Sequence, residues 1–272
     1  MTTEPSPPAD TYTHGHHESV LRSHRWRTAE NSAAYLLPDL KAGQSLLDIG
    51  CGPGNITWDL ARRVAPGPTV GADLAADVIA QATAATPADI TNVRFETADI
   101  YALSYADARF DVVHAHQVLQ HVSDPVAALR EMRRVMVPGG VVAARDSDYE
   151  AFTWAPSDPM LTRWLDIYRA TAVGNNATPD AGRYLLGWAQ QAGFADVTAS
   201  ASVWCYADAE SRLWWGGLWA DRVLHSAFAV QSVAQGHTTE QELNDISDAW
   251  RRWSTAADGW FAVLHGEILC RN

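Results

Sequence analysis

A glycine-rich turn between an apolar strand and a helix constrains this chain more than any other feature. Residues 46–57 read LLDIGCGPGNIT, so Gly50, Gly52 and Gly54 follow Asp48 at intervals of two. Glycine lets the backbone turn sharply, and it lets a ligand approach where any side chain would block the way. A strand that ends in this way and opens a helix predicts an α/β fold that holds a nucleoside-bearing cofactor at the turn.

The spacing of the glycines indicates which kind of cofactor this is. Dinucleotide-binding turns carry G-x-G-x-x-G and direct a helix N-terminus at a pyrophosphate. Here the pattern is G-x-G-x-G, and Asp48 precedes it. A carboxylate in front of the turn suits an ammonium group better than a phosphate. The alternative is a turn that only packs a strand against a helix and binds nothing.

Three later strand ends add residues in the order that such a site needs. The predicted strand 69–74 carries Asp73, whose two carboxylate oxygens can accept both hydroxyls of a ribose. Strand 93–100 ends in an acid and an apolar residue, and strand 110–115 leads into a polar segment. The candidate cofactor-binding residues are Asp48, Gly50, Cys51, Gly52, Asn55, Asp73, Leu74, Asp99, Ile100, His116 and Gln117.

Together these motifs resemble those of class I S-adenosylmethionine-dependent methyltransferases, in particular the group around ubiquinone and menaquinone biosynthesis. The resemblance covers residues 46–144 and is specific for the cofactor rather than for the acceptor. It implies S-adenosyl-L-methionine as cofactor and a Rossmann-like sheet of seven mostly parallel strands with an antiparallel final strand. It also implies that Asp99 binds the adenine amino group, and that the segment starting at His116 meets the methionine end.

The expected organisation is one domain with additions. Residues 1–12 form a disordered tail, residues 13–39 a helical cap with one helix over 18–37, and residues 40–150 the cofactor-binding core. Residues 151–272 complete the sheet in the same domain, with a helical lid inserted at about 207–254. Ten of the twelve tryptophans lie in this last part, where large amphipathic rings can cover or bind something.

Composition limits the classes of partner, metal and cellular location that this chain is expected to have. A net charge of −12 disfavours nucleic acid, because phosphate binding relies on clustered Lys and Arg. Three cysteines without C-x-x-C spacing favour neither a disulfide framework nor zinc. We expect a cytoplasmic protein, since the first residues lack an apolar stretch and no run reaches the ~18 apolar residues of a membrane span. The sequence leaves a homo-oligomer open.

Candidate catalytic residues follow the fourth and fifth predicted strands. His121 and Asp146 lie on adjacent strand ends, and a carboxylate beside an imidazole makes a competent general base. Some small-molecule methyltransferases of the family use such a pair. His116 and His17 are alternative bases. In the alternative interpretation, both residues are structural: His121 only packs at a helix entry, and Asp146 pairs with an arginine. A base is also dispensable, because a sulfonium is already strongly electrophilic.

The substrate side is expected to be aromatic. Candidate pocket residues are Tyr12, His16, His17, Tyr149, Trp154, Trp215 and Trp219. Core packing of the lid is the alternative role for the tryptophans, because they recur at helical spacing. No metal is expected: the histidines at positions 14–24 lack the other ligands and the supporting residues of a metal site.

These features predict methyl transfer to a small apolar or aromatic acceptor, at O, N or C. The long Trp-rich insertion departs from a minimal quinone methyltransferase and so disfavours a quinone acceptor. A cyclase or other enzyme that binds the cofactor without methylating is the first alternative. A non-catalytic binding protein and a nicotinamide oxidoreductase are the others.

Overall fold

The structure is a computed structural model that describes residues 11–15 and 18–272. His16 and His17, two of the candidate pocket residues, and residues 1–10 of the expected tail lie outside this part. Tyr12 was expected to belong to the tail, but its ring packs edge-on against His121 at 4.8 Å between centroids.

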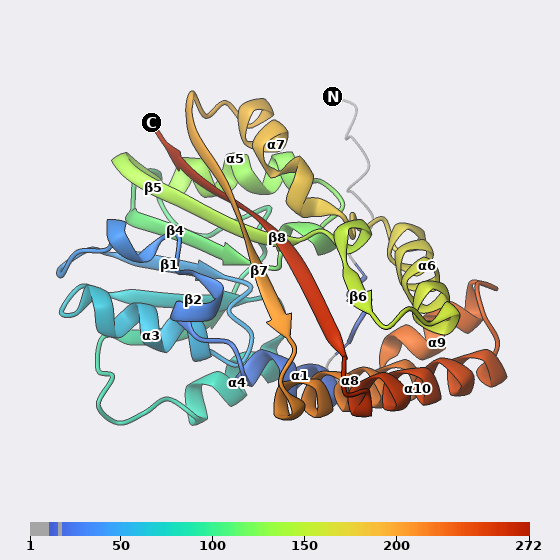
Figure 1. Cartoon of the computed structure of the whole chain (residues 1–272). Helices are drawn as coiled ribbons and strands as arrows, with labels where there is room; N and C mark the ends of the chain where they lie inside the picture. The colour runs from blue at the N-terminus through green and yellow to red at the C-terminus, as the bar shows by residue number, and fades with distance from the viewer. Residues whose placement is uncertain (1–10, 16–17) are drawn as a thin grey trace.

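The sheet is α/β in class and mostly parallel, as the sequence predicts (Figure 1). Its order is β3-β2-β1-β4-β5-β8-β6, with β7 paired to β8. Strand β8 runs antiparallel to its neighbours β5, β6 and β7. The strands are β1 (Leu46–Ile49), β2 (Thr69–Asp73), β3 (Val93–Thr97), β4 (Phe110–His116), β5 (Met136–Ser147), β6 (Thr153–Ala155), β7 (Asp196–Tyr206) and β8 (Trp260–Arg271).

Within residues 11–15 and 18–272 the sheet has eight strands, one more than the seven expected. The additional strand is β6, which pairs residues 153–155 with residues 260–262 of β8. Strand β8 is long enough to pair with β5 through residues 265–270 and still extend beyond it. Three residues are too few to show an alternating pattern in the sequence, so this strand was missed.

Helices cover both faces of the sheet, because alternate residues of the inner strands are apolar on both sides. Leu46 packs with α3 on one face, whereas Leu47 packs with α5 and α7 on the other. Helix α4 packs against β2 and β3. The flanking helices are α3 (Asn55–Val64), α4 (Ala76–Ala84), α5 (Pro125–Val135) and α7 (Leu185–Gln191).

The expected N-terminal helix over residues 18–37 is broken in the structure. It consists of α1 (Glu18–Arg25), α2 (Ala29–Ser32) and the short 3-10 helix η1 (Leu37–Asp39). Helix α1 ends at Arg25, and Thr28 begins α2, because its side chain accepts a hydrogen bond from the Asn31 amide at 3.2 Å. The break places Arg27 between the two helices.

The predicted lid is present as three helices beside α6 (Pro159–Gly174). Figure 1 shows α8 (Ala209–His225) and α10 (Glu240–Thr255) lying side by side, with α9 (Ala227–Ala234) between them and α6. Trp164, Trp219 and Trp250 are all almost fully buried at the centre of this region. Most of the late tryptophans therefore build a second hydrophobic core, as the packing interpretation proposed.

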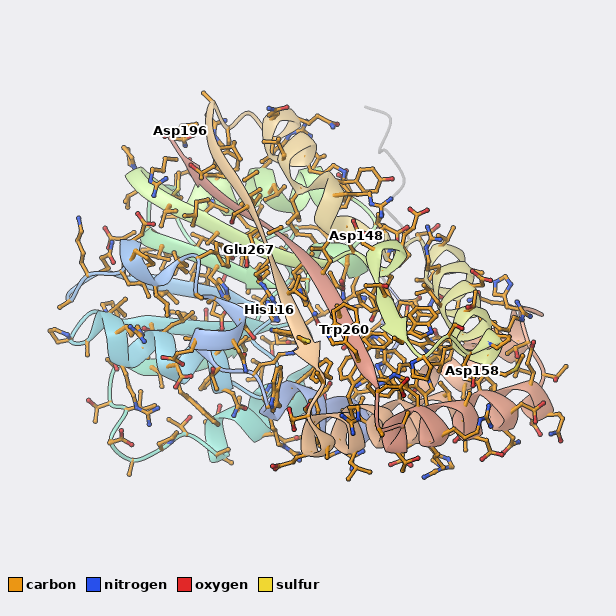
Figure 2. The ribbon with its side chains drawn as sticks, viewed as in Figure 1. His116, Asp148, Asp158, Asp196, Trp260 and Glu267 are labelled. Atoms are coloured by element: carbon orange, nitrogen blue, oxygen red, sulfur yellow. The ribbon has the colours of Figure 1, made fainter. Side chains whose placement is uncertain are left out.

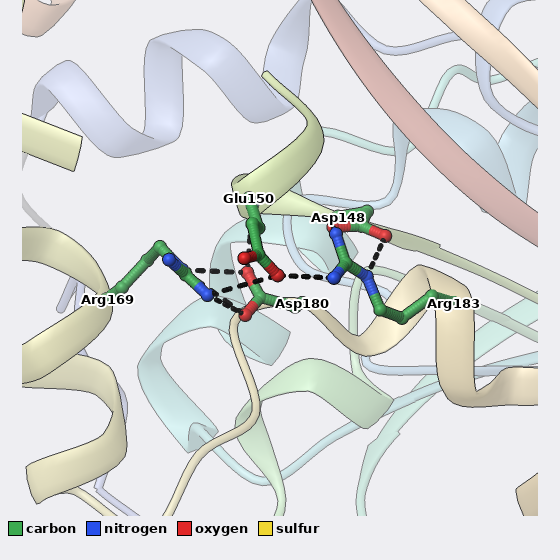
Figure 3. Close-up of polar contacts among 5 residues, drawn as sticks. All are labelled: Asp148, Glu150, Arg169, Asp180 and Arg183. Atoms are coloured by element: carbon green, nitrogen blue, oxygen red, sulfur yellow. Dashed lines mark hydrogen bonds and ion pairs between the residues drawn. The ribbon is translucent and has the colours of Figure 1, made fainter. Parts of the chain in front are cut away.

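A network of ion pairs fixes the chain where it leaves β5 (Figure 3). Arg183 donates two hydrogen bonds to Asp148 at 2.7 Å and also contacts Glu150. Arg169 of α6 binds Asp180 at 2.7 Å and Glu150 at 3.3 Å. Exposed pairs contribute little one by one, but a bidentate pair on a buried carboxylate such as Asp148 restricts geometry.

The lid core yields a stability prediction. Trp250 is fully buried, and its ring centroid lies 4.8 Å from that of Trp164 and 5.4 Å from that of Phe261. Trp250→Ala should lower the free energy of unfolding by about 3–5 kcal/mol, the usual cost of truncating a buried large aromatic. Urea unfolding followed by circular dichroism measures the change.

Trp260→Ala is the matched control, because Trp260 is 39% exposed at the start of β8. It should cost far less than Trp250→Ala. Equal effects of the two substitutions would contradict a lid stabilised by its tryptophan core.

Candidate functional site

The site lies where the order of the strands reverses. Strand β1 pairs on one side with β2 and on the other with β4, so the connections that follow β1 and β4 leave in opposite directions and open a crevice beyond the carboxyl ends of these strands. A cavity of about 400 Å³ occupies this position. Its lining combines the glycine turn, the ends of the first strands, the α1–α2 break and the lid helix α8.

The glycine turn serves two purposes. Gly50 has φ +65°, and a Cβ there would lie 2.3 Å from a methyl of Val118, so protein packing demands glycine. Gly52 has φ +55° and lines the cavity, yet a Cβ there would meet only His24, at 3.6 Å. A side chain at position 52 would therefore fill the cavity, which is what a cofactor cradle requires.

Two hydrogen bonds from backbone amides fix the carboxylate of Asp73. Its Oδ2 accepts a hydrogen bond from the Gly52 amide at 3.1 Å, and its Oδ1 accepts one from the Ala75 amide at 3.0 Å. Each carboxylate oxygen retains acceptor capacity, and the residue lines the cavity. The geometry fits the predicted fork for two ribose hydroxyls.

The adenine end of the predicted site is also assembled. Asp99 and Ile100 line the cavity, and Asp99 Oδ1 accepts a hydrogen bond from the Tyr101 amide at 2.9 Å. Leu74 lines the same region and is 65% exposed, an open apolar surface suited to a flat ring. Cys51 lines the cavity as a neutral thiol, because burial raises its pKa.

Asp48 does not present a free carboxylate, contrary to the sequence interpretation. The residue is 2% exposed; its Oδ1 contacts His114 Nδ1 at 2.7 Å and its Oδ2 accepts from the Thr57 hydroxyl at 2.5 Å. The carboxylate therefore joins β1 to β4 and α3. Asn55, another predicted residue, lines the cavity and donates to the Arg25 carbonyl at 3.3 Å.

An aromatic chamber forms the other half of the cavity. We use this name for Tyr12, Tyr149, Phe152, Trp204, Tyr206, Trp214, Trp215 and Trp219, all of which line it. Four of these residues were predicted: Tyr12, Tyr149, Trp215 and Trp219. Trp154 was predicted wrongly, since it lies outside the lining and stacks on Phe261 at 5.7 Å instead.

The structure does not bring His121 and Asp146 into contact. The Asp146 Oδ1 accepts from the backbone amide of Gln120 at 3.1 Å, whereas His121 Nε2 meets the Gln120 side-chain nitrogen at 2.9 Å. Gln120 thus stands where the proposed orienting acid was expected. His121 lines the cavity and Asp146 does not; burial raises the pKa of Asp146 to about 7.

Gln120 also decides which tautomer His121 adopts. The Ser147 hydroxyl and amide both donate to Gln120 Oε1, which fixes the amide orientation. The Gln120 nitrogen must then donate to His121 Nε2, leaving the proton on Nδ1. Burial lowers the pKa of His121 to about 3. The imidazole is therefore neutral, with its accepting nitrogen already occupied.

His116 differs from His121 in having no partner. Both ring nitrogens are buried without a hydrogen bond among the described residues, and the side chain lines the cavity near Trp204. Figure 2 labels it near the centre of the molecule, between the sheet and the helices of the lid. Burial lowers its pKa well below the usual value.

Charge divides the cavity into two halves. Asp48, Asp73 and Asp99 lie at the cofactor half and Arg222 of α8 lies at the chamber, whereas Arg27 lies between the two halves, because it contacts both Gln117 and Trp204. These five are the Asp, Glu, Lys or Arg residues of the lining within the described part of the chain. The sequence predicts Arg222 on the same lid helix as Trp215 and Trp219 but predicts no site role for either arginine, because only the fold shows which parts of their segments face the cavity.

Comparisons with known proteins agree with this geometry. The methyltransferase-domain family matches residues 40–194. An uncharacterized methyltransferase of Schizosaccharomyces pombe is 35% identical over 272 residues, covering 96% of each chain. A probable methyltransferase of Aspergillus luteorubrus is 31% identical over 277 residues, again covering 96% of each. The chain is a class I S-adenosylmethionine-dependent methyltransferase. The resemblance seen in the sequence is thereby confirmed.

A solved structure supports the fold of this methyltransferase. The YcgJ protein of Bacillus subtilis matches with a TM-score of 0.58 and 17% identity, covering 89% of this chain and 99% of that one. In the described residues, no helix of the methyltransferase is long and apolar enough to cross a membrane. No group of three or more His, Cys, Asp or Glu side chains in that part is arranged to hold a metal ion.

The buried imidazoles yield a pH prediction. Burial lowers the pKa of His14, His116 and His265 well below 6.5 and that of His121 to about 3, so the unfolded chain binds protons at these four imidazoles that the folded chain does not. Stability should therefore fall as pH drops below about 6.5, by up to about 1.4 kcal/mol per pH unit for each imidazole. Asp146 opposes this with one group, because its raised pKa favours the folded state at low pH.

Urea unfolding between pH 5 and pH 8 measures this slope. His116→Asn should make it shallower by one proton without losing a hydrogen bond, because neither His116 nitrogen has a partner. An unchanged slope in this variant would contradict a neutral, buried His116.

Proposed function

We propose that this methyltransferase acts on a small acceptor with an apolar or aromatic body, held in the aromatic chamber. One observation carries this proposal: a single cavity connects the glycine turn with the ring-lined chamber. A methyl donor at one end and an acceptor at the other would then lie in line, and positioning of this kind can supply much of the rate enhancement.

The cofactor fits the first half of the cavity. Asp73 would accept the ribose hydroxyls, while Asp99 and Ile100 would meet the adenine. Gly52 would face the cofactor directly, and His116 and Gln117 would lie near the methionine end. When bound, S-adenosylmethionine supplies a methyl group on a sulfonium. Asp48 would support the cofactor site indirectly, because its contacts connect β1, β4 and α3 below the turn.

The acceptor fits the chamber. Trp215 and Trp219 are almost fully buried and serve both the lid core and the chamber wall. Such rings bind planar apolar groups and exclude water from the reacting atoms. Helix α8 of the lid supplies Trp214, Trp215 and Trp219 to the chamber wall, so the lid would shape the acceptor site. Whether O, N or C receives the methyl depends on the acceptor placed there.

His121 and Asp146 remain our candidate catalytic residues, with roles changed by the geometry. His121 carries its proton on Nδ1 and would donate a hydrogen bond into the chamber rather than accept a proton. Asp146 would act as a positioning residue through Gln120, because its Oδ1 accepts a hydrogen bond from the Gln120 backbone amide. His116 keeps both nitrogens available and is the alternative proton acceptor. His17 lies outside the described residues.

Calorimetry and mass spectrometry test the proposed function. The protein should bind S-adenosylhomocysteine, and incubation with methyl-deuterated S-adenosylmethionine and a library of small aromatic compounds should add one labelled methyl to an acceptor. Binding of neither cofactor form, or transfer only to polar acceptors without a ring or apolar chain, would overturn the proposal.

Asp73→Ala tests the ribose contact. Loss of the carboxylate should weaken S-adenosylhomocysteine binding by about 2–3 kcal/mol, the range for one side of charge-assisted hydrogen bonds. Calorimetry measures the affinity and thermal unfolding confirms that the variant folds. Asp77→Ala is the control, because Asp77 lies in the next helix and outside the cavity lining. Wild-type affinity in folded Asp73→Ala would refute the role.

Gly52→Val tests the cradle. The branched side chain would occupy the cavity where the cofactor should approach, so binding should fall below detection. Because Gly52 has φ +55°, valine there also strains the backbone and should lower the melting temperature, so affinity is measured at a temperature where the variant is folded. Gly43→Val is the control, because Gly43 also has a positive φ (+91°), a Cβ there meets nothing within 4 Å, and Gly43 is outside the lining. Normal cofactor binding by Gly52→Val would mean that the turn only packs.

A further inference from the structure

Arg27 is placed unusually for an arginine. It lies in the break between α1 and α2, lines the cavity, and stacks over Trp204 with its guanidinium carbon 5.7 Å from the ring centroid. Its Nη2 donates to the Gln117 side-chain oxygen at 2.5 Å, and its Nε is buried without a partner. The side chain is half-buried overall, so part of it faces the cavity.

Among the described residues, no carboxylate forms an ion pair with Arg27, and Asp146 acts on it only from a greater distance. Among the described residues, the groups that act on it most strongly are Tyr12, Arg222, Tyr206 and Tyr149, and none is a carboxylate. Burial lowers the pKa of Arg27 to about 10, which still leaves it charged at neutral pH. A desolvated cation is costly unless an anion accompanies it, so a ligand that brings an anion into this cavity would be favoured.

A chain of hydrogen bonds aims the guanidinium. His265 Nδ1 lies 3.1 Å from the Val263 carbonyl oxygen, which can only accept, so Nδ1 carries the proton. His265 Nε2 then accepts from the Gln117 nitrogen at 2.8 Å, and this leaves the Gln117 oxygen to accept from Arg27. Each side chain in this series of hydrogen bonds therefore has one consistent donor or acceptor role.

The backbone of Gln117 supports the same interpretation. Its φ is +53°, in the left-handed region that residues other than glycine seldom occupy. The residue is held there by its amide, which donates to the Arg145 carbonyl at 2.7 Å. Strained residues persist where the surrounding structure over-determines them, and they gather at ligand sites. In this backbone conformation, the Gln117 side chain contacts both Arg27 and His265.

We propose that Arg27, oriented by Gln117 and His265, binds a ligand carboxylate in this cavity. This inference rests on the proposed function, because it assumes that the cavity holds the cofactor and its acceptor. Two sources offer the same chemistry: the methionine carboxylate of the cofactor, and a carboxylate on the acceptor. A planar guanidinium suits a carboxylate better than an ammonium would, because it can donate two parallel hydrogen bonds.

Paired ligands separate the two sources. S-adenosylhomocysteine and its decarboxylated analogue differ only in the carboxylate, and both keep the ammonium group. With the protein saturated with S-adenosylhomocysteine, 2-naphthoate and its neutral counterpart 2-naphthamide probe the chamber in the same way. Calorimetry measures all four affinities in the wild type and in Arg27→Met, which removes the charge but keeps an apolar side chain.

In Arg27→Met, we expect one carboxylate ligand to lose about 30-fold in affinity while its neutral counterpart changes less than about three-fold. Loss with S-adenosylhomocysteine assigns the anion to the cofactor, and loss with 2-naphthoate assigns it to the acceptor. Arg22→Met is the matched control, because Arg22 is an exposed arginine of α1 paired with Asp221. It should change none of the four affinities.

Gln117→Leu tests the positioning chain. It keeps the charge of Arg27 but removes the oxygen that orients it, so the preference for the carboxylate over the neutral ligand should narrow by about 3- to 10-fold. This preference is a ratio within one variant, so a general loss of folded protein does not alter it.

The outcomes keep the two proposals apart. Wild-type preferences for both carboxylates in folded Arg27→Met would overturn the role of Arg27 while leaving the methyltransferase site intact. Failure of the wild-type protein to bind S-adenosylhomocysteine or its analogue would overturn the proposed cofactor site itself.

Discussion

The parallel pairing of β1 with both β2 and β4 is the constraint on which the rest of this molecule depends. It forces the two crossover connections to leave in opposite directions, and the opening between them is where the cavity forms. Below the glycine turn, the buried contacts of Asp48 with His114 and Thr57 connect β1 to β4 and α3. The residue that looked like a ligand for the cofactor therefore keeps the crevice in shape.

The same rings stabilise the lid and shape the acceptor half of the cavity. Trp219 packs edge-on against Trp164 at 4.6 Å within the lid core, and it also lines the chamber. Packing and recognition are therefore not alternatives for this residue. A change that alters the chamber at Trp215 or Trp219 also alters the core behind it, so acceptor specificity and stability are coupled through α8.

The sequence predicted the parts of the site that depend on local geometry. The positions of Gly52, Asp73 and Asp99 follow from strand ends and turn chemistry, which short stretches of sequence specify. Arg27 and Gln120 could not be found in this way, because their roles depend on partners more than twenty residues away in the chain. The three residues of β6 were missed for the same reason, since only β8 makes them a strand.

The side chains of the chamber suggest how methyl transfer would proceed without a strong base. His121 has its accepting nitrogen occupied by Gln120, and burial makes both His121 and His116 weakly basic. A nucleophile that must lose a proton would gain little from them, whereas one already present as an anion would need none. Arg27 and Arg222 in the cavity favour the anionic form of a bound group, because each cation stabilises a nearby negative charge. If the acceptor rather than the cofactor brings the anion to Arg27, the distribution of charge in the cavity and the tautomer of His121 would both favour binding an acceptor that is already ionised over deprotonating a neutral one.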